Sequence, residues 1–263
     1  MKITFIGFGN MAKAIAAGLA GNSRYELRAS APSLPQNTST AKIKTDPSNL
    51  AFLSDADVLI LAVKPALMKT VLTEINEHLS PSCLILSIAA GLSLAWFDKQ
   101  CKTTKPAIVR AMPNVAAAVA KSATPMIANA RVTPLQKKWA EELFRQIGLA
   151  AWVDDEQQMN AFTALSGSGP AYIFLFMESM MQTAVRLGLP AETAQSFTLQ
   201  TFAGAVSLSL AKKQPLAELR EQVTSPNGTT AAALDIFMQQ NLNTLVETAM
   251  QAAFKRANEL EQS

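Results

Sequence analysis

The 263-residue sequence predicts an α/β protein with a doubly wound, mostly parallel sheet in its first part and helices alone in its second. Two observations support this fold class. Short apolar runs alternate with helical stretches over residues 1–153, as in βαβ units with right-handed crossovers. Long helical stretches with few strand signals fill residues 154–263. We therefore predict two domains that divide between residues 153 and 154.

The first domain is expected to contain a central set of strands and two edge strands. The central candidates are residues 3–6, 26–29, 58–63, 83–88 and 107–110. The runs that begin at Val58 and Cys83 are continuously apolar, as in strands that are buried on both faces of a parallel sheet. Residues 125–128 and 150–153 are the candidates for edge strands.

The second domain is expected to be a series of helices that are bounded by proline and glycine. The expected helices are residues 170–187, 190–212, 215–223, 229–240 and 242–261. The charges divide near the same place, with 17 Lys and Arg against 9 Asp and Glu in residues 1–152, and 6 against 11 thereafter. A basic first half suits a polyanionic ligand, although chance drift of surface charge gives the same asymmetry.

The composition excludes several classes of function. Hydrophobic residues make up 49% and charged residues 16%, below the usual value of about 25%, so a subunit interface is expected to cover part of the surface. The net charge of +3 is too small for a nucleic-acid-binding footprint. The two cysteines and one histidine argue against a disulfide framework, a metal site and a Ser-His-Asp triad.

No segment has the pattern of a signal peptide or the length of a membrane span. The apolar run near the start is very short, whereas a signal peptide needs a longer apolar stretch and a small-residue cleavage site. The most apolar later stretch, around residues 172–181, is shorter than the roughly 20 apolar residues that a spanning helix needs. We therefore expect a cytoplasmic protein with no membrane partner.

A glycine-rich turn follows the first expected strand and begins a helix. Gly7, Gly9 and Ala12 match the G-x-G-x-x-G/A fingerprint of dinucleotide-binding Rossmann domains. Gly7 permits the tight turn, Gly9 lets the backbone approach a pyrophosphate, and Ala12 lets the helix pack closely. The amides at the helix start, at Asn10 and Met11, are expected to bind phosphate. An ordinary glycine turn in a βα unit is the alternative.

The end of the second expected strand bears on the choice of cofactor. Proteins that bind NAD place Asp or Glu there, next to the ribose 2′-hydroxyl. This strand ends at Ser30 without an acid, and Arg28 and Ser30 could receive a 2′-phosphate instead. We therefore expect NADP (as NADPH), with NAD as the second possibility. A solvated arginine is the alternative interpretation of Arg28.

Further strand ends are expected at the same edge of the sheet, where open α/β sheets bind their ligands. The segment after the strand at Val58 consists of Ala62, Val63, Lys64 and Pro65. Ser87 is followed by small residues that would let a nicotinamide or ribose lie against the backbone, with Ala89, Ala90 and Gly91 as the candidates. Met112–Asn114 ends a third strand on this edge.

One polar loop stands out in the second half, from Val223 to Thr230, and it precedes a helix. The hydroxyls and amides at a helix N-terminus can hold a carboxylate. Because Ser, Thr and Asn are also ordinary N-cap residues, local physics slightly favours a plain helix cap.

Together these segments resemble pyrroline-5-carboxylate reductase, the last enzyme of proline synthesis, over nearly the whole chain. The matching segments are residues 6–11, 62–65, 87–91, 110–114, 165–172, 188–190 and 223–230. The resemblance implies NADPH-dependent reduction of 1-pyrroline-5-carboxylate to L-proline, by hydride transfer to the C=N carbon. It also implies an N-terminal Rossmann domain for cofactor binding and a C-terminal helical domain for dimerisation and substrate binding.

The resemblance further implies a homodimer with interlocked helical domains. Each active site would join one subunit's Rossmann domain to the partner's helices, and larger rings of dimers occur in the family. In the polar loop, the backbone at Thr229 and Thr230 would hold the substrate carboxylate. Ser225 and Gly228 would also belong to the substrate-binding site. The Thr230 hydroxyl would bond the ring nitrogen, which makes Thr230 the catalytic candidate. Asn49 falls where the family has a cofactor-contacting asparagine.

The chain departs from the family pattern at two positions. Asn227 replaces a glycine of the polar loop, and Asn tolerates a positive φ better than most residues. Asn160 stands where an aspartate is common, and no role is carried over to it.

Two other functions stay open from the residues. A β-hydroxyacid dehydrogenase would use a helix lysine as its acid, but Lys212, Lys213 and Lys255 all lie near expected helix ends. A non-catalytic NADPH sensor would keep the glycine turn without needing the polar loop.

Overall fold

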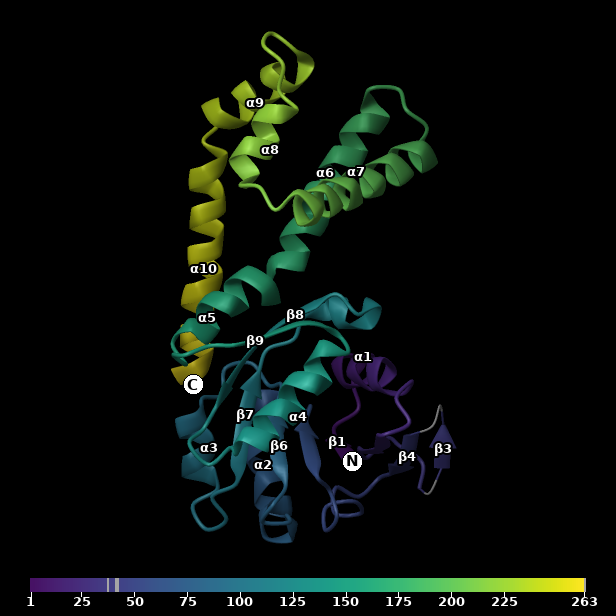
Figure 1. The fold of residues 1–263 in the computed structure, drawn as a ribbon, viewed down its shortest axis with the longest axis vertical. Helices are drawn as coiled ribbons and strands as arrows, with labels where there is room; N and C mark the ends of the chain where they lie inside the picture. Colours follow the sequence, from purple (N-terminus) through teal and green to yellow (C-terminus); the bar gives the residue numbers. More distant parts are fainter. Residues whose placement is uncertain (37, 41–42, 263) are drawn as a thin grey trace. The chain divides into compact units, whose positions relative to one another are not determined.

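The computed structural model describes residues 1–36, 38–40 and 43–262, and the chain divides into two compact units (Figure 1). One unit consists of Met1–Pro170 together with Ala253–Ser263, and the other of Ala171–Ala252. The units therefore divide the chain later than residue 153, and the chain end returns to the first unit. The domain boundary between residues 153 and 154 stays a prediction.

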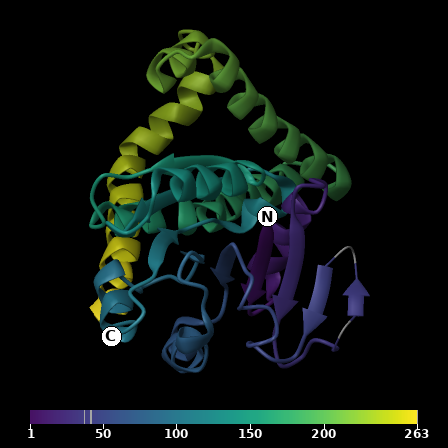
Figure 2. The same cartoon turned by 60° about the horizontal axis from the view of Figure 1, so that its bottom comes forward.

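The first unit is built around a mostly parallel sheet (Figures 1 and 2). In the described residues the strand order is β3-β4-β2-β1-β5-β6-β7-β8-β9. The strands are β1 (Lys2–Ile6), β2 (Glu26–Ser30), β3 (Thr38–Thr40), β4 (Ile43–Asp46), β5 (Val58–Leu61), β6 (Leu84–Ser87), β7 (Ala107–Ala111), β8 (Ser122–Ala128) and β9 (Gly148–Trp152). Neighbouring strands from β4 to β7 are parallel, whereas β3 and β8 run antiparallel to β4 and β7. The predicted doubly wound sheet is confirmed.

The sheet differs from the expectation at its two margins. Strands β3 and β4 were not expected, because both are short and β4 has Lys44 and Asp46 among its four residues. Strand β8 is not an edge strand, since β9 returns parallel to it after helix α4 (Pro134–Arg145) and covers its outer side. An apolar run in a sequence does not show which strand becomes its neighbour.

Two pairs of helices cover the two faces of the sheet. Helices α1 (Asn10–Leu19) and α4 share one apolar core, and α2 (Pro65–Ile75) and α3 (Leu94–Gln100) share the other. Within β5, Val58 and Ile60 belong to the first core, whereas Leu59 and Leu61 belong to the second. This alternation explains the continuously apolar sequence of the strand, because both of its faces are buried.

The helical part of the chain follows the predicted series closely. The helices are α5 (Gln158–Phe162), α6 (Gly169–Arg186), α7 (Ala191–Lys212), α8 (Leu216–Gln222), α9 (Thr229–Gln239) and α10 (Leu242–Gln262). A π-helical turn over Thr163–Gly167 joins α5 to α6 and was not expected. None of the described helices combines the length and the apolar character that crossing a bilayer requires.

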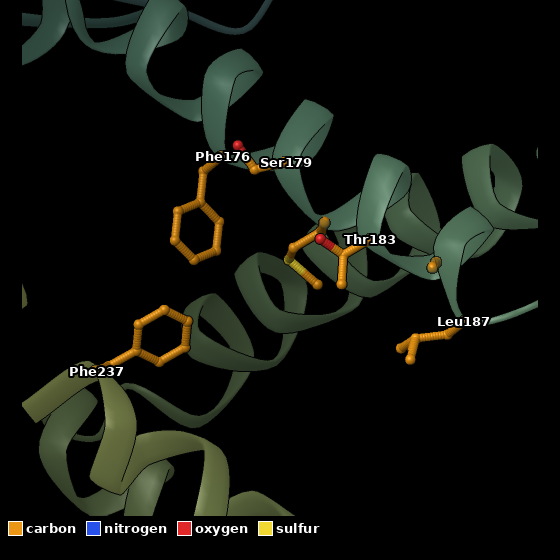
Figure 3. Close-up of a pocket in the computed structure, with 7 residues that line it drawn as sticks. Phe176, Ser179, Thr183, Leu187 and Phe237 are labelled. Carbon is orange, nitrogen blue, oxygen red and sulfur yellow. The ribbon is translucent and has the colours of Figure 1, made fainter. Parts of the chain in front are cut away.

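The second unit leaves most of its apolar side chains uncovered. Helices α6 and α9 contain no buried residue, and α7 buries only Ala194 and Thr198. Phe176 of α6 and Phe237 of α9 contact each other, with their ring centroids 6.1 Å apart, and both line an apolar cavity of about 420 Å³ (Figure 3). Exposed apolar area on this scale marks an interaction surface.

Candidate functional site

The order of the strands creates a switch point at the carboxyl ends of β1 and β5, where doubly wound sheets bind their ligands. The Gly7 amide, just after β1, donates to the Ser30 carbonyl at 2.8 Å. The Ala62 amide, just after β5, donates to the Ile6 carbonyl at 2.8 Å. The structure thus brings two of the predicted cofactor segments to one edge of the sheet.

The glycine-rich turn has the backbone that a dinucleotide site requires. Gly7 has φ +82°, and a Cβ there would lie 2.8 Å from the Val63 side chain. Gly9 caps α1 without a side-chain hydrogen bond, and no atom lies within 4 Å of where its Cβ would be. Ala12 is buried in the core beneath the helix. The open helix start, with no acidic residue in its first turn, fits a pyrophosphate.

The loops after β5 and β6 line the same edge. Lys64 is the exposed N-cap of α2, and Pro65 is its first residue. After Ser87, which ends β6, Ala89 is buried and Ala90 is half-buried. Gly91 has φ +73°, a conformation that favours glycine. Because β6 lies directly beside β5, these loops continue along the same edge of the sheet, away from the glycine-rich turn.

Ser30 and Asn49 meet at the carboxyl ends of β2 and β4. The Ser30 hydroxyl lies 3.4 Å from Asn49 Oδ1, and Asn49 Nδ2 donates to Glu74 at 2.8 Å. Asp46 is in register with Ser30, and its carboxylate accepts the Ser48 amide at 2.8 Å. Asp46 was not among the predicted site residues, because no strand was expected there.

The structure overturns the assignment of Arg28 to a 2′-phosphate. Arg28 is 6% exposed and pairs with Asp55 at 2.5 Å and Glu26 at 3.2 Å, and its guanidinium lies over the Phe52 ring. Asp55 precedes β5 and Glu26 begins β2, so the guanidinium lies at the amino ends of the strands, away from the edge that carries the glycine-rich turn. Hydrogen bonds from Arg28 and Lys2 hold the pKa of the Asp55 carboxyl well below its usual range. Because Arg28 is buried, the alternative interpretation that it is a solvated arginine is wrong as well.

The polar loop ends in an open helix start. Helix α9 has Gly228 as its N-cap, and no side chain caps its amides, so the plain side-chain cap is not formed. A Cβ at Gly228 would overlap the Ser225 hydroxyl. Asn227 has φ +57°, which confirms that Asn takes the left-handed conformation in place of glycine. Thr229 and Thr230 therefore present the first, unmatched amides of α9.

Comparisons with known proteins agree with this geometry. The model of the pyrroline-5-carboxylate reductase dimerisation family matches residues 156–260, and a model of coenzyme F420-dependent NADP oxidoreductases matches residues 2–91. A pyrroline-5-carboxylate reductase from Pseudomonas aeruginosa is 43% identical over 98% of this chain and 96% of its own. The chain belongs to the pyrroline-5-carboxylate reductase family.

Solved structures of the family have the same fold. The reductase from Coxiella burnetii is 39% identical, with a TM-score of 0.89 over 99% of this chain and 98% of its own. The Plasmodium falciparum reductase, solved with NADP bound, is 30% identical, with a TM-score of 0.90 over 99% of this chain and 98% of its own. This membership decides against the hydroxyacid dehydrogenase and the non-catalytic sensor. Lys212, Lys213 and Lys255 are all exposed.

Asn160 is a buried hydrogen-bond donor in this chain. Asn160 is 3% exposed, and its Nδ2 donates to Asn258 at 2.8 Å and to Glu261 at 2.7 Å. Both partners belong to the last turns of α10, so Asn160 ties the chain end to the first unit.

Proposed function

We propose that this chain reduces 1-pyrroline-5-carboxylate to L-proline with NADPH. The observation that carries the proposal is the uncapped start of α9 at Gly228–Thr230, in a chain that matches the reductase family along its whole length. A helix N-terminus of this kind is suited to a carboxylate, and the substrate carries one.

The cofactor supplies the hydride, and the residues present fit its diphosphate. The amides of Asn10 and Met11 begin an uncapped helix, and the backbone at Gly9 is open to a ligand. The preference for NADPH over NADH is supported by the absence of an acid at Ser30, where β2 ends, and by NADP in the Plasmodium falciparum relative. Ser30, Asn49 and the loops after β5 and β6 complete the proposed cofactor site, and Arg28 is not part of it.

The substrate site is proposed at the polar loop. The amides of Thr229 and Thr230 would bind the carboxylate, with Ser225 and Gly228 shaping the turn, and the Thr230 hydroxyl would bond the ring nitrogen. The imine can be protonated in water before it binds, so the site needs no strong acid. The protein's contribution is to hold one face of the iminium in line with the hydride donor, which is an orientation effect.

The second unit is proposed to form a dimer with the second unit of another copy of this chain, with the helices of the two copies interlocked. The enzyme is also proposed to be cytoplasmic. The support is the apolar surface of α6, α7 and α9, on which Phe174 is 61% exposed and Phe197 is 69% exposed. Each polar loop would then serve the Rossmann unit of the partner subunit. Rings of several dimers would be larger assemblies of the same kind. Light scattering measures the mass of the particle in solution and so distinguishes a dimer from a ring of dimers.

The test is NADPH oxidation by the purified chain with 1-pyrroline-5-carboxylate, with NADH in parallel and proline quantified. Rapid oxidation that yields proline is the expected result, and protein that binds NADPH without turnover would refute the proposal. For Thr230→Ala we expect a loss of kcat/KM of about 10-fold with unchanged NADPH affinity, because a single hydrogen bond is removed. Thr230→Ser keeps the hydroxyl and should recover most of the activity, and a Thr230→Ala variant as active as the native chain would contradict the role of this residue.

A further inference from the structure

Arg110 is a buried cation that the proposed reaction does not use. It lies in β7, in register with Ser87 at the end of β6, and its side chain is 4% exposed. Its Nη1 pairs with Glu156 Oε1 at 2.9 Å and with Glu261 Oε1 at 2.6 Å. Glu261 Oε2 accepts a further hydrogen bond from Asn160 at 2.7 Å. All four residues belong to the first unit.

Buried ion pairs contribute little net stability, because desolvation offsets most of the attraction, and their best-attested use is to specify one arrangement. The arrangement specified here surrounds the loop after β6. Glu156 Oε1 also accepts the Leu94 amide at 2.8 Å, at the start of α3, which fixes the far end of that loop. Glu261 fixes the last turn of α10 next to the same loop.

The last turn of α10 lies against the loop at Gly91. A Cβ at Gly91 would come within 3.0 Å of the Leu260 carbonyl oxygen, so the helix backbone fills the space that a side chain would need. The loop from Ser87 to Leu94 is therefore fixed at its base by β6, at Gly91 by α10, and at Leu94 by Glu156. The attachment at Gly91 depends on the last turn of α10, which contains Glu261, and the attachment at Leu94 depends on Glu156. Both glutamates pair with the Arg110 guanidinium.

We propose that Arg110, Glu156, Glu261 and Asn160 form a clamp that positions the loop after β6 for the nicotinamide end of the cofactor. Arg110 and Glu261 are positioning residues, because they act through the backbone of Ala89–Gly91. This inference rests on the proposed function, in which that loop borders the nicotinamide. In the proposed site the pyrophosphate binds at the glycine-rich turn and the 2′-phosphate end near Ser30, where none of the clamp residues makes a contact among the described hydrogen bonds.

The test compares two ligands that differ only at the nicotinamide. Glu261→Gln keeps the shape of the side chain and removes its charge. Arg110→Lys keeps the positive charge but lacks the planar guanidinium group with its several N–H donors. For both variants we expect the Kd of NADPH to rise about tenfold, the effect of losing one charge-assisted hydrogen bond. The Kd of 2′-phospho-ADP-ribose, which lacks nicotinamide, should change by less than about twofold. At saturating NADPH, kcat should fall as well, because the hydride donor is less well aligned.

Glu259→Gln is the matched control, because it breaks an exposed ion pair with Arg256 on the same last turns of α10. It should leave both dissociation constants unchanged. Equal losses for the two ligands, or no loss for either in folded Glu261→Gln protein, would overturn the proposal. The binding measurement needs no imine, so its failure is distinct from failure of the proposed reaction, which turnover by the unmodified chain reports.

Discussion

Replacing Arg28 with methionine separates a stabilising role from a cofactor-binding role. The substitution removes ion pairs to Asp55 at 2.5 Å and to Glu26 at 3.2 Å, and keeps the apolar stem against Phe52. The carboxylate side chains are 46% and 36% exposed, so water solvates them once the guanidinium is gone. The expected loss is therefore about 2 kcal/mol, below the cost of breaking a fully buried pair.

A loss of that size lowers Tm by about 4–8 °C in a chain of this length, which a thermal melt measures. The ratio of kcat/KM for NADPH to that for NADH should stay within about twofold of the native value. Lys44→Met is the control, because it removes an exposed ion pair to the same Glu26 and should cost about 0.5 kcal/mol or less. A Tm unchanged in Arg28→Met, together with a tenfold loss of NADPH preference, would refute the reasoning and restore Arg28 to the cofactor site.

Three further predictions concern other parts of the chain. Asp55 has a depressed pKa in the fold, chiefly through its hydrogen bond from Arg28, so it adds stability above the unfolded pKa of about 4 and loses it as the pH falls towards the lower folded value. The stability difference between native and Asp55→Asn protein in urea should therefore shrink below about pH 4, and a constant difference would contradict the shift. Burial raises the pKa of Cys83 to about 12 and that of Cys101 to about 11, so neither thiol should react with a disulfide reagent near neutral pH until denaturant is added. Prompt reaction of the folded protein would show that the thiols are accessible. Gly228→Ala should raise the KM for the imine and leave NADPH affinity unchanged, because the added Cβ would overlap Ser225 in the polar loop alone; unchanged kinetics would remove this turn from the substrate site.

Much of the fold follows from local patterns in the sequence. The apolar strand at Val58 and the proline-bounded helices are set by burial and chain stiffness, and the structure has them within a few residues of the predicted bounds. The short strand at Ile43 was missed because its four residues include only one that is strongly apolar. The position of β8 inside the sheet could not be predicted, since pairing with β9 joins segments that are separated by a whole helix.

The candidate site was predictable where the backbone determines the chemistry. Gly7 and Asn227 have the positive φ angles that their residue types favour. The assignment of Arg28 to the 2′-phosphate was wrong, because a strand position does not show which end of the sheet a long side chain reaches. Its ion-pair partner Asp55 also lies far away in the sequence. The clamp at Arg110 was missed for the same reason, since its partner Glu261 lies at the other end of the chain.

The return of the chain end to the first unit constrains how the protein is made. Ala253–Ser263 belong to the same compact unit as the sheet, and Ala257 is buried there. Synthesis proceeds from the N-terminus, so the sheet emerges from the ribosome long before its last partners. Arg110 therefore has no Glu261 to pair with until all of the intervening helices have been translated. The first unit can be completed only after the second has been synthesised, so a first unit with its Arg110–Glu261 ion pair formed belongs to a chain whose second unit has already been translated.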